Sequence, residues 1–280
     1  MNYDHSYHAG NFADVFKHLV LVALFERLTL KEKAFCYIDT HSGYPSYRLD
    51  SVKALKTKEA AQGIQKLLKL NPPEPLFQKY FSLIEAANPS GVTTLPNVYP
   101  GSSTFAALLK RPQDRLMLNE WMAEPYQALK QCFKQDQSIH CHQQEAYLFL
   151  NAVLPPKEKR GLIFIDPPYE NAQEFENIFL ALQKAVPKFP QGIYAIWYPI
   201  KDPLRVEGWI KKMQKHFSQE MLNLTCCPWG KDIAQRLSGS GLLILNPPWQ
   251  LEAALAPIIK TIETCFLTSI TNAHIIQSNE

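Results

Sequence analysis

The sequence predicts an α/β fold built around one mostly parallel β-sheet. From residue 115 onward, short apolar runs typical of buried strands alternate with helical patterns, which favours parallel strands joined by helices. The last two apolar runs, Glu220–Cys227 and Gly241–Asn246, have no helix between them and predict a terminal antiparallel hairpin. Doubly wound sheets of this kind bind ligands at the carboxyl ends of their parallel strands, so the chemistry should lie there.

The N-terminal third of the chain carries three further segments. Phe12–Leu30 has apolar residues at the spacing of an amphipathic helix, with Asn11 as a candidate N-cap, and Ala34–Asp39 predicts the first strand. From Leu49 to Gly91 the pattern is helical, rich in lysine and interrupted by proline. We therefore expect three parts: the N-terminal helix and first strand (1–48), a small inserted helical subdomain (49–95) and the remainder of the main domain (96–280).

The rest of the main domain follows in regular order. A turn at Pro100–Ser103 opens a helix, and strands and helices then alternate. The predicted strands are Arg115–Glu120, Ser138–His142, Gly161–Asp166 and Gly192–Pro199, and helices are expected from Pro125, from Glu145, near Glu174–Val186 and near Leu204–Phe217.

Composition limits the classes of protein to consider. The 280 residues are 46% apolar, enough for one large core, and a net charge of +3 permits a nucleic-acid partner without requiring one. The six cysteines show no C-x-x-C spacing and the N-terminus lacks the apolar core of a signal peptide. No stretch approaches the roughly 20 apolar residues of a membrane helix. We expect a cytoplasmic monomer with no membrane partner.

One short phrase occurs twice, as GLIFIDPPYE at Gly161–Glu170 and as GLLILNPPWQ at Gly241–Gln250. If the last strand is antiparallel, the second copy faces the edge of the sheet opposite the ligand crevice. Its prolines then only stop the strand, and Trp249 packs on the rim. The first copy closes a middle strand, which directs Asp166 toward the crevice.

An acidic or amide residue, two prolines and an aromatic residue after a strand resemble the catalytic motif of enzymes that methylate exocyclic amino groups with S-adenosylmethionine. Such an amine is a poor nucleophile, because its lone pair is delocalised into the ring. Asp166 and the carbonyl of Pro167 could accept its two N–H bonds, and Tyr169 could stack on the base. The alternative is that the prolines simply end the strand.

Other strand ends offer candidate contacts for the methyl donor. Gly43 follows the first strand, Glu120 could accept both ribose hydroxyls, and Glu145 could accept from the adenine amino group. The alternative for both glutamates is a carboxylate favoured by a helix dipole. His140, Cys141 and His142 belong to no complete four-ligand set, so we expect no metal.

Several longer stretches closely resemble the ribosomal large-subunit RNA methyltransferase J family over nearly the whole chain. They are YDHSYHAGNFADVFKH near the N-terminus, DTHSG, YPGSS, LPP, YAIWYP and SGSGLLILNPPW. The resemblance implies a Rossmann-like class I methyltransferase sheet with an inserted helical subdomain. It also implies S-adenosylmethionine as the donor and N6 of one adenine in 23S ribosomal RNA as the acceptor.

The resemblance also implies roles for individual residues. Asp166 would be the catalytic acidic residue, and Tyr3 would contact the substrate near the transfer site. Donor contacts would come from Lys17, His18, His41, Ser102, Glu120, Glu145, Ala146 and Asp166. Two departures bear on donor affinity: SGYPSY stands where relatives commonly carry AGAG, and Glu145–Ala146 stands where Asp-Gly is usual.

Three hypotheses for function remain open on the sequence. The first is an RNA adenine N6-methyltransferase whose inserted helices bind RNA through Lys53, Lys56, Lys58, Lys66 and Lys69, although such lysines are also typical of a solvated helix face. The second is a DNA adenine methyltransferase, or a protein that serves the use of external DNA. The third is a nucleic-acid-binding protein with a decayed donor site.

Overall fold

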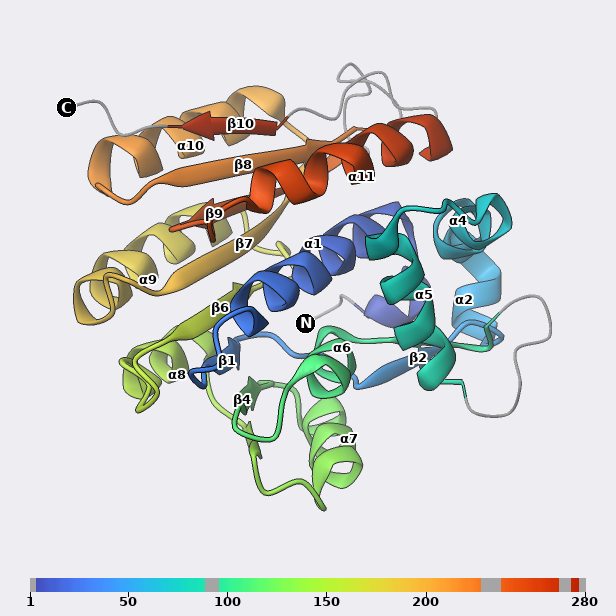
Figure 1. Cartoon of the computed structure of the whole chain (residues 1–280), viewed down its shortest axis with the longest axis horizontal. Coiled ribbons are helices and arrows are strands. Elements are labelled where there is room, and N and C mark those ends of the chain that lie inside the picture. The colour runs from blue at the N-terminus through green and yellow to red at the C-terminus, as the bar shows by residue number, and fades with distance from the viewer. Residues whose placement is uncertain (1–3, 89–95, 228–237, 267–272, 277–280) are drawn as a thin grey trace.

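The computed structural model describes residues 4–88, 96–227, 238–266 and 273–276. Its centre is an eight-stranded sheet with the order β10-β8-β9-β7-β6-β1-β4-β5 (Figure 1). The strands are β1 (Cys36–Asp39), β4 (Arg115–Asn119), β5 (Ile139–His142), β6 (Gly161–Ile165), β7 (Ile193–Ile200), β8 (Met221–Cys226), β9 (Gly239–Leu245) and β10 (Ala273–Ile276).

The direction of the strands confirms the predicted sheet. Strands β5, β4, β1, β6 and β7 pair in parallel, whereas β9 is antiparallel to both β7 and β8. Helix α11 (Leu251–Phe266) and strand β10, which pairs antiparallel with β8, were not predicted. Within the described part of the chain, no helix combines the length and apolar character needed to cross a bilayer.

Two hydrophobic cores lie on opposite faces of the sheet. One face is covered by α1 (Phe12–Thr29), α6 (Ser102–Leu109), α7 (Ala123–Phe133) and α11, and the other by α8 (Ala146–Val153), α9 (Glu174–Lys188) and α10 (Pro203–His216). Successive strand residues alternate between the cores, as Tyr37 and Ile38 do, because side chains along a strand point to opposite faces.

Helix α1 is buried on nearly all sides, so the prediction of an amphipathic helix was wrong. It packs against α5 (Pro75–Ala86), α6, α11 and strand β9, and even Asp14, Lys17 and His18 are buried. A helix covered on all sides by other elements has no solvent face to keep polar. The predicted N-cap is confirmed, because the side chain of Asn11 accepts a hydrogen bond from the backbone N–H of Asp14 (2.9 Å).

The stretch between β1 and α6 is helical as predicted, and it shares its core with α1. The antiparallel pair β2 (Ser46–Arg48) and β3 (Val98–Pro100) joins its two ends. Its helices are α2 (Val52–Thr57), α3 (Glu59–Gln62), α4 (Ile64–Leu70) and α5 (Pro75–Ala86). Their buried residues, such as Phe77 and Tyr80, belong to the same core cluster as the residues of α1.

The inserted helices hold the segment before α1. In this segment His5–Tyr7 form a short 3-10 helix, η1. Lys53 pairs with Asp4 (2.7 Å), and His8 pairs with Glu59 (2.8 Å). The backbones also approach closely, since a Cβ at Gly63 would lie 2.0 Å from the carbonyl oxygen of Gly10. The insert therefore fixes where the N-terminal segment lies.

The second proline phrase lies at the edge of the sheet that the strand direction predicts. Asn246 follows β9 and donates from Nδ2 to the carbonyls of Pro190 and Gly192 (both 2.8 Å), which precede β7. The expected packing of Trp249 on the rim was wrong, because the side chain is 80% exposed. The strand ends through a backbone turn into α11, with Gln250 at φ 60°, and needs no packed ring.

We predict that Asn246→Ala destabilises the fold without impairing chemistry. The change removes two hydrogen bonds and leaves alanine at φ 53°, which together should cost about 2 kcal/mol in chemical denaturation. Asn246→Gly is the matched control, because glycine tolerates this φ, so it should cost less. Strong loss of activity at unchanged stability would contradict the structural role.

The His8–Glu59 pair should make stability depend on pH. Its hydrogen bond raises the pKa of His8 above the ordinary 6.5, so this stabilisation is present below pH 6.5 and is lost as pH rises through the raised value. The melting temperature of His8→Gln should therefore differ most from the parent near pH 6 and least near pH 8. His140→Gln, at an exposed position on β5, is the control; an equal trend in both variants would refute the assignment.

Candidate active site

The carboxyl ends of β1, β4, β5 and β6 meet at one cavity of about 1480 Å³. Gly43, Glu120, Glu145 and Asp166, one from each strand end, all line it. A volume of this size exceeds that of a typical small-molecule site, so it can hold a nucleotide-sized donor together with a base. The first proline phrase and the candidate donor contacts thus share one space.

The structure brings together almost all the side chains singled out from the sequence. Those that line the cavity are Lys17, His18, His41, Gly43, Ser102, Glu120, Glu145, Ala146, Asp166, Pro167 and Tyr169, together with Lys53 and Lys58. Tyr3 lies outside the described residues. The remaining candidates, Lys56, Lys66 and Lys69, do not line the cavity.

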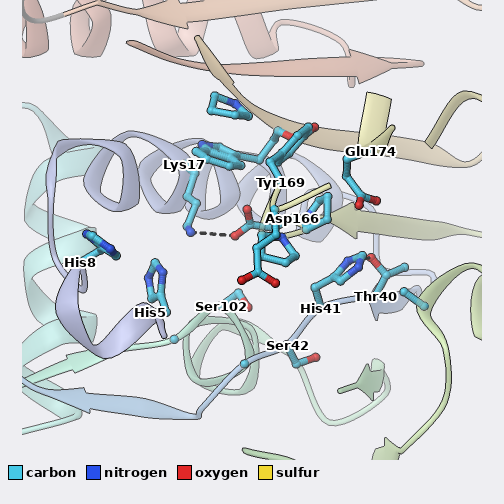
Figure 2. A pocket seen from close by; sticks show the side chains of 18 of the residues that line it. His5, His8, Lys17, Thr40, His41, Ser42, Ser102, Asp166, Tyr169 and Glu174 are labelled. Carbon is cyan, nitrogen blue, oxygen red and sulfur yellow. Dashed lines mark hydrogen bonds and ion pairs between the residues drawn. The ribbon is translucent and has the colours of Figure 1, made fainter. Parts of the chain in front are cut away.

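Asp166 is held by a cation from the first helix. The Nζ of Lys17 lies 2.7 Å from Oδ2 of Asp166 and 2.7 Å from Oδ1 of Asp14, and Figure 2 shows the contact with Asp166. The side chains of Lys17 and Asp166 are only 7% and 15% exposed. Lys17 also lies over the ring of Trp197, 5.5 Å from its centroid. This ion pair engages Oδ2 and leaves Oδ1 of Asp166 outside the contact.

The Tyr169 ring has a fixed orientation beside Asp166. Its hydroxyl donates to the carbonyl of Trp197 (2.7 Å), and its ring contacts Phe175 and Trp197 at centroid distances of 5.0 and 5.7 Å. Its backbone has φ 51°, which is strained for a bulky residue and is often found at functional sites. Burial raises the pKa of Tyr169 far above its ordinary value, so the hydroxyl stays protonated.

A buried carboxylate that the sequence analysis missed supports the donor side. Asp39 ends β1 and accepts from Ser102 Oγ (2.7 Å), Tyr37 Oη (2.9 Å) and the backbone N–H of His41 (3.2 Å). Burial raises its pKa to about 7. The signal was present, because Asp39 closes a predicted strand as Glu120 does.

Glu120 and Gly43 form one unit. The Glu120 carboxylate accepts from the backbone N–H groups of Gly43 (2.9 Å) and Met122 (2.7 Å), and burial raises its pKa. Each carboxylate oxygen has a second lone pair, so it can also accept from ribose. Gly43 is at φ 59°, and a Cβ there would lie 2.5 Å from the Tyr47 hydroxyl. Glycine is therefore required at this position although the neighbouring glycines are missing.

Glu145 caps helix α8 and faces the cavity. Its carboxylate accepts from the backbone N–H groups of Tyr147 (3.1 Å) and Leu148 (2.7 Å), which is the helix-terminal role kept as the alternative. Tyr147 also donates from its hydroxyl to Glu174, and its ring meets His41 edge-on at 5.9 Å. Figure 2 shows His41 and Glu174 on the opposite side of Asp166 from Lys17.

The two histidines predicted to contact the donor are neutral. Burial lowers the pKa of His18 far below its ordinary value and that of His41 to about 3. His18 is bonded through Nδ1 to the Tyr99 hydroxyl (2.8 Å), and His41 through Nδ1 to the Thr40 hydroxyl (2.8 Å). Neither imidazole therefore repels a cationic ligand.

The charge of the cavity suits a cation. Nine acidic side chains line it (Asp4, Asp14, Glu59, Glu120, Glu124, Glu145, Asp166, Glu170 and Glu174) against five lysines (Lys17, Lys53, Lys58, Lys184 and Lys201). With His18 and His41 neutral, this excess of carboxylates favours ligands that carry positive charge. S-adenosylmethionine carries a sulfonium and an ammonium group, so the residues present fit it.

The five candidate lysines of the insert have different surroundings. Lys53, paired with Asp4, and Lys58 line the cavity, while Lys56 and Lys69 are exposed elsewhere on the insert. Lys66 is half-buried. Burial raises the pKa of the Cys265 thiol in α11, and the charge of Lys66 partly offsets that rise.

Comparisons with known proteins agree with this geometry. The family model described as "Ribosomal RNA large subunit methyltransferase D, RlmJ" matches residues 32–275. Two proteins named ribosomal RNA large subunit methyltransferase J, from Haemophilus influenzae and Escherichia coli, are 36% and 33% identical to this chain. These alignments cover 92% of the chain and 92% and 91% of those proteins.

A solved structure is similar over the whole fold. Protein LPL1258 from Legionella pneumophila is 34% identical, with a TM-score of 0.87 over 98% of this chain and 99% of that one. The chain therefore belongs to the ribosomal RNA large subunit methyltransferase J family, whose members are S-adenosylmethionine-dependent methyltransferases, and its methyl donor is S-adenosylmethionine.

Proposed function

We propose that this chain methylates N6 of one adenine in 23S ribosomal RNA, acting as a monomer in the cytoplasm. One observation carries the proposal: the turn Asp166–Tyr169 opens into the cavity that the donor-side strand ends also line. Support for ribosomal RNA comes from the names of the two relatives, and support for an exocyclic amine comes from the acceptors at this turn.

The residues of this turn can orient an amine that is a poor nucleophile. Oδ1 of Asp166 and the carbonyl of Pro167 can accept the two N–H bonds and direct the nitrogen lone pair toward the donor. The fixed ring of Tyr169 can stack on the extruded base, and Tyr3 is a further candidate contact. The donor supplies, when bound, a methyl group already activated by a sulfonium. Alignment therefore contributes more than a strong base would.

We predict that Asp166→Ala lowers methyl transfer to a 23S RNA fragment by about 100-fold or more, because an acceptor for the amine is removed. Transfer is measured with labelled donor, and donor binding is measured by calorimetry and should stay within a few-fold of the parent. Asn246→Ala, from the second proline phrase, is the control and should keep its activity.

The same assay distinguishes the other candidates. Faster methylation of a DNA duplex than of the RNA fragment would favour a DNA adenine methyltransferase. No detectable donor binding at millimolar concentration would favour a decayed donor site. Near-normal RNA methylation by Asp166→Ala would overturn the assignment of the catalytic residue.

The insert lysines give a separate prediction about RNA binding. Changing the exposed pair Lys56 and Lys58 to glutamine should weaken RNA binding and reduce its salt slope by about 0.7 for each phosphate that the variant no longer binds. The matched control changes Lys31 and Lys33, which are exposed just before β1 at the opposite edge of the sheet. Equal slopes for the two double variants in filter binding would show that the insert does not contact phosphate.

A further inference from the structure

Asp14, in the first turn of α1, is a buried carboxylate with three polar partners beside the site, and it was not singled out from the sequence. It is 1% exposed. Its Oδ1 lies 2.7 Å from Lys17 Nζ, and its Oδ2 accepts from the backbone N–H of Gly10 (2.9 Å) and contacts His5 Nε2 (2.9 Å). Its own backbone N–H donates to the Asn11 cap.

These contacts form a continuous chain to the reacting centre. It runs from His5 through Asp14 and Lys17 to Asp166, with every step between 2.7 and 2.9 Å. Figure 2 shows His5 and Lys17 on the same side of Asp166. Burial by itself would raise the pKa of Asp14, but the charges of His5 and Lys17 hold it well below its ordinary value. Asp14 therefore remains ionised between them.

The charge of Asp14 affects how strongly Asp166 can accept from an amine. Lys17 lies between two carboxylates and shares its positive charge with both. Without the charge on Asp14, the ammonium would be attracted to Asp166 alone, in a buried setting where such attraction is strong. The Asp166 carboxylate would then be a weaker acceptor and could turn toward Lys17.

We propose that Asp14 is a positioning residue for methyl transfer: it fixes Lys17 so that Asp166 keeps its acceptor strength and its orientation toward the target amine. This inference rests on the proposed function of Asp166. Asp14 itself acts through Lys17 and need not touch the substrate or the reacting atoms.

The test is a double-mutant cycle between Asp14 and Lys17 in the full chain. Asp14→Asn replaces one carboxylate oxygen with an amide N–H₂ group. That group then faces either Lys17 or the N–H groups of Gly10 and His5, which are donors themselves. Single-turnover methyl transfer at saturating donor and RNA should therefore fall by about 10- to 100-fold in Asp14→Asn. In a Lys17→Gln background, Asp14→Asn should change the remaining rate by less than about twofold, because the two residues act as a unit.

A role in stability alone predicts a different result. Asp114 is equally buried, pairs with Arg111 and lies before β4 at the opposite edge of the sheet. Asp114→Asn should lower the melting temperature but leave the methyl-transfer rate unchanged. If Asp14→Asn costs the same factor with and without Lys17, or leaves the rate within about twofold of the parent, the inference is wrong.

The design distinguishes this inference from the proposed function. If the parent protein does not methylate the RNA fragment, the proposed function fails; if it does and the cycle shows no coupling, only the role of Asp14 fails. Should Asp14→Asn not fold, Asp14→Glu and Asp14→Gln replace it, since they match in size and differ in charge. The Glu variant should be about tenfold faster than the Gln variant, and equal rates would overturn the inference.

Discussion

The ion pair between Lys17 and Asp166 joins the first helix to the turn after β6. The orientation of Asp166 and the proposed role of Asp14 depend on this contact, because it relates the N-terminal segment to the acceptor of the target amine. A buried ion pair adds little net stability over apolar packing, yet losing one partner costs about 3–5 kcal/mol, because the other charge stays buried. We therefore infer that this pair contributes mainly to specificity. An arrangement of α1 against the sheet that separates Lys17 from Asp166 would be less stable, because it would leave a buried charge unpaired.

The inserted helices also help to position Lys17, because they hold the segment that leads into α1. Their lysine content alone does not indicate this structural role. The insert holds the N-terminal segment through Lys53–Asp4 and His8–Glu59, and Gly63 lets its backbone approach Gly10. That segment carries His5 and leads into Asp14 and Lys17. An insertion far from β6 in sequence thus contributes to the position of Asp166, and Lys53 is better explained by its acidic partner than by phosphate alone.

The sheet and the placement of the two proline phrases at opposite edges of it could be predicted from the sequence, because both depend on local periodicity and strand direction. Asp166 and Asn246 have nearly the same neighbours, and only the direction of β6 and β9 separates them. Asp14 could not be assigned a role, because Lys17 and Asp166 come together beside it only in the fold. The strand-end position of Asp39 was visible in the sequence, but its contact with Ser102 was not. The burial of α1 was missed because what covers an apolar helix is a tertiary fact. The presence of α11 was missed although the sequence carries a signal for it, since Leu251, Leu255 and Ile258 recur at helical spacing.

The acid-rich cavity poses a physical problem for an enzyme that binds RNA, since the carboxylates that favour a cationic donor repel phosphates. A base that leaves its helix offers a solution, because the uncharged base can enter the cavity while the phosphates stay at the rim, screened by salt over about 8–10 Å. Lys58 and Lys201 line that cavity and are exposed, so under the proposed function they are candidates to contact the backbone. In this arrangement Lys17 offsets part of the charge of Asp166, the carboxylate proposed to lie beside the base. The electrostatics of the donor site and of the RNA site are then compatible within one opening.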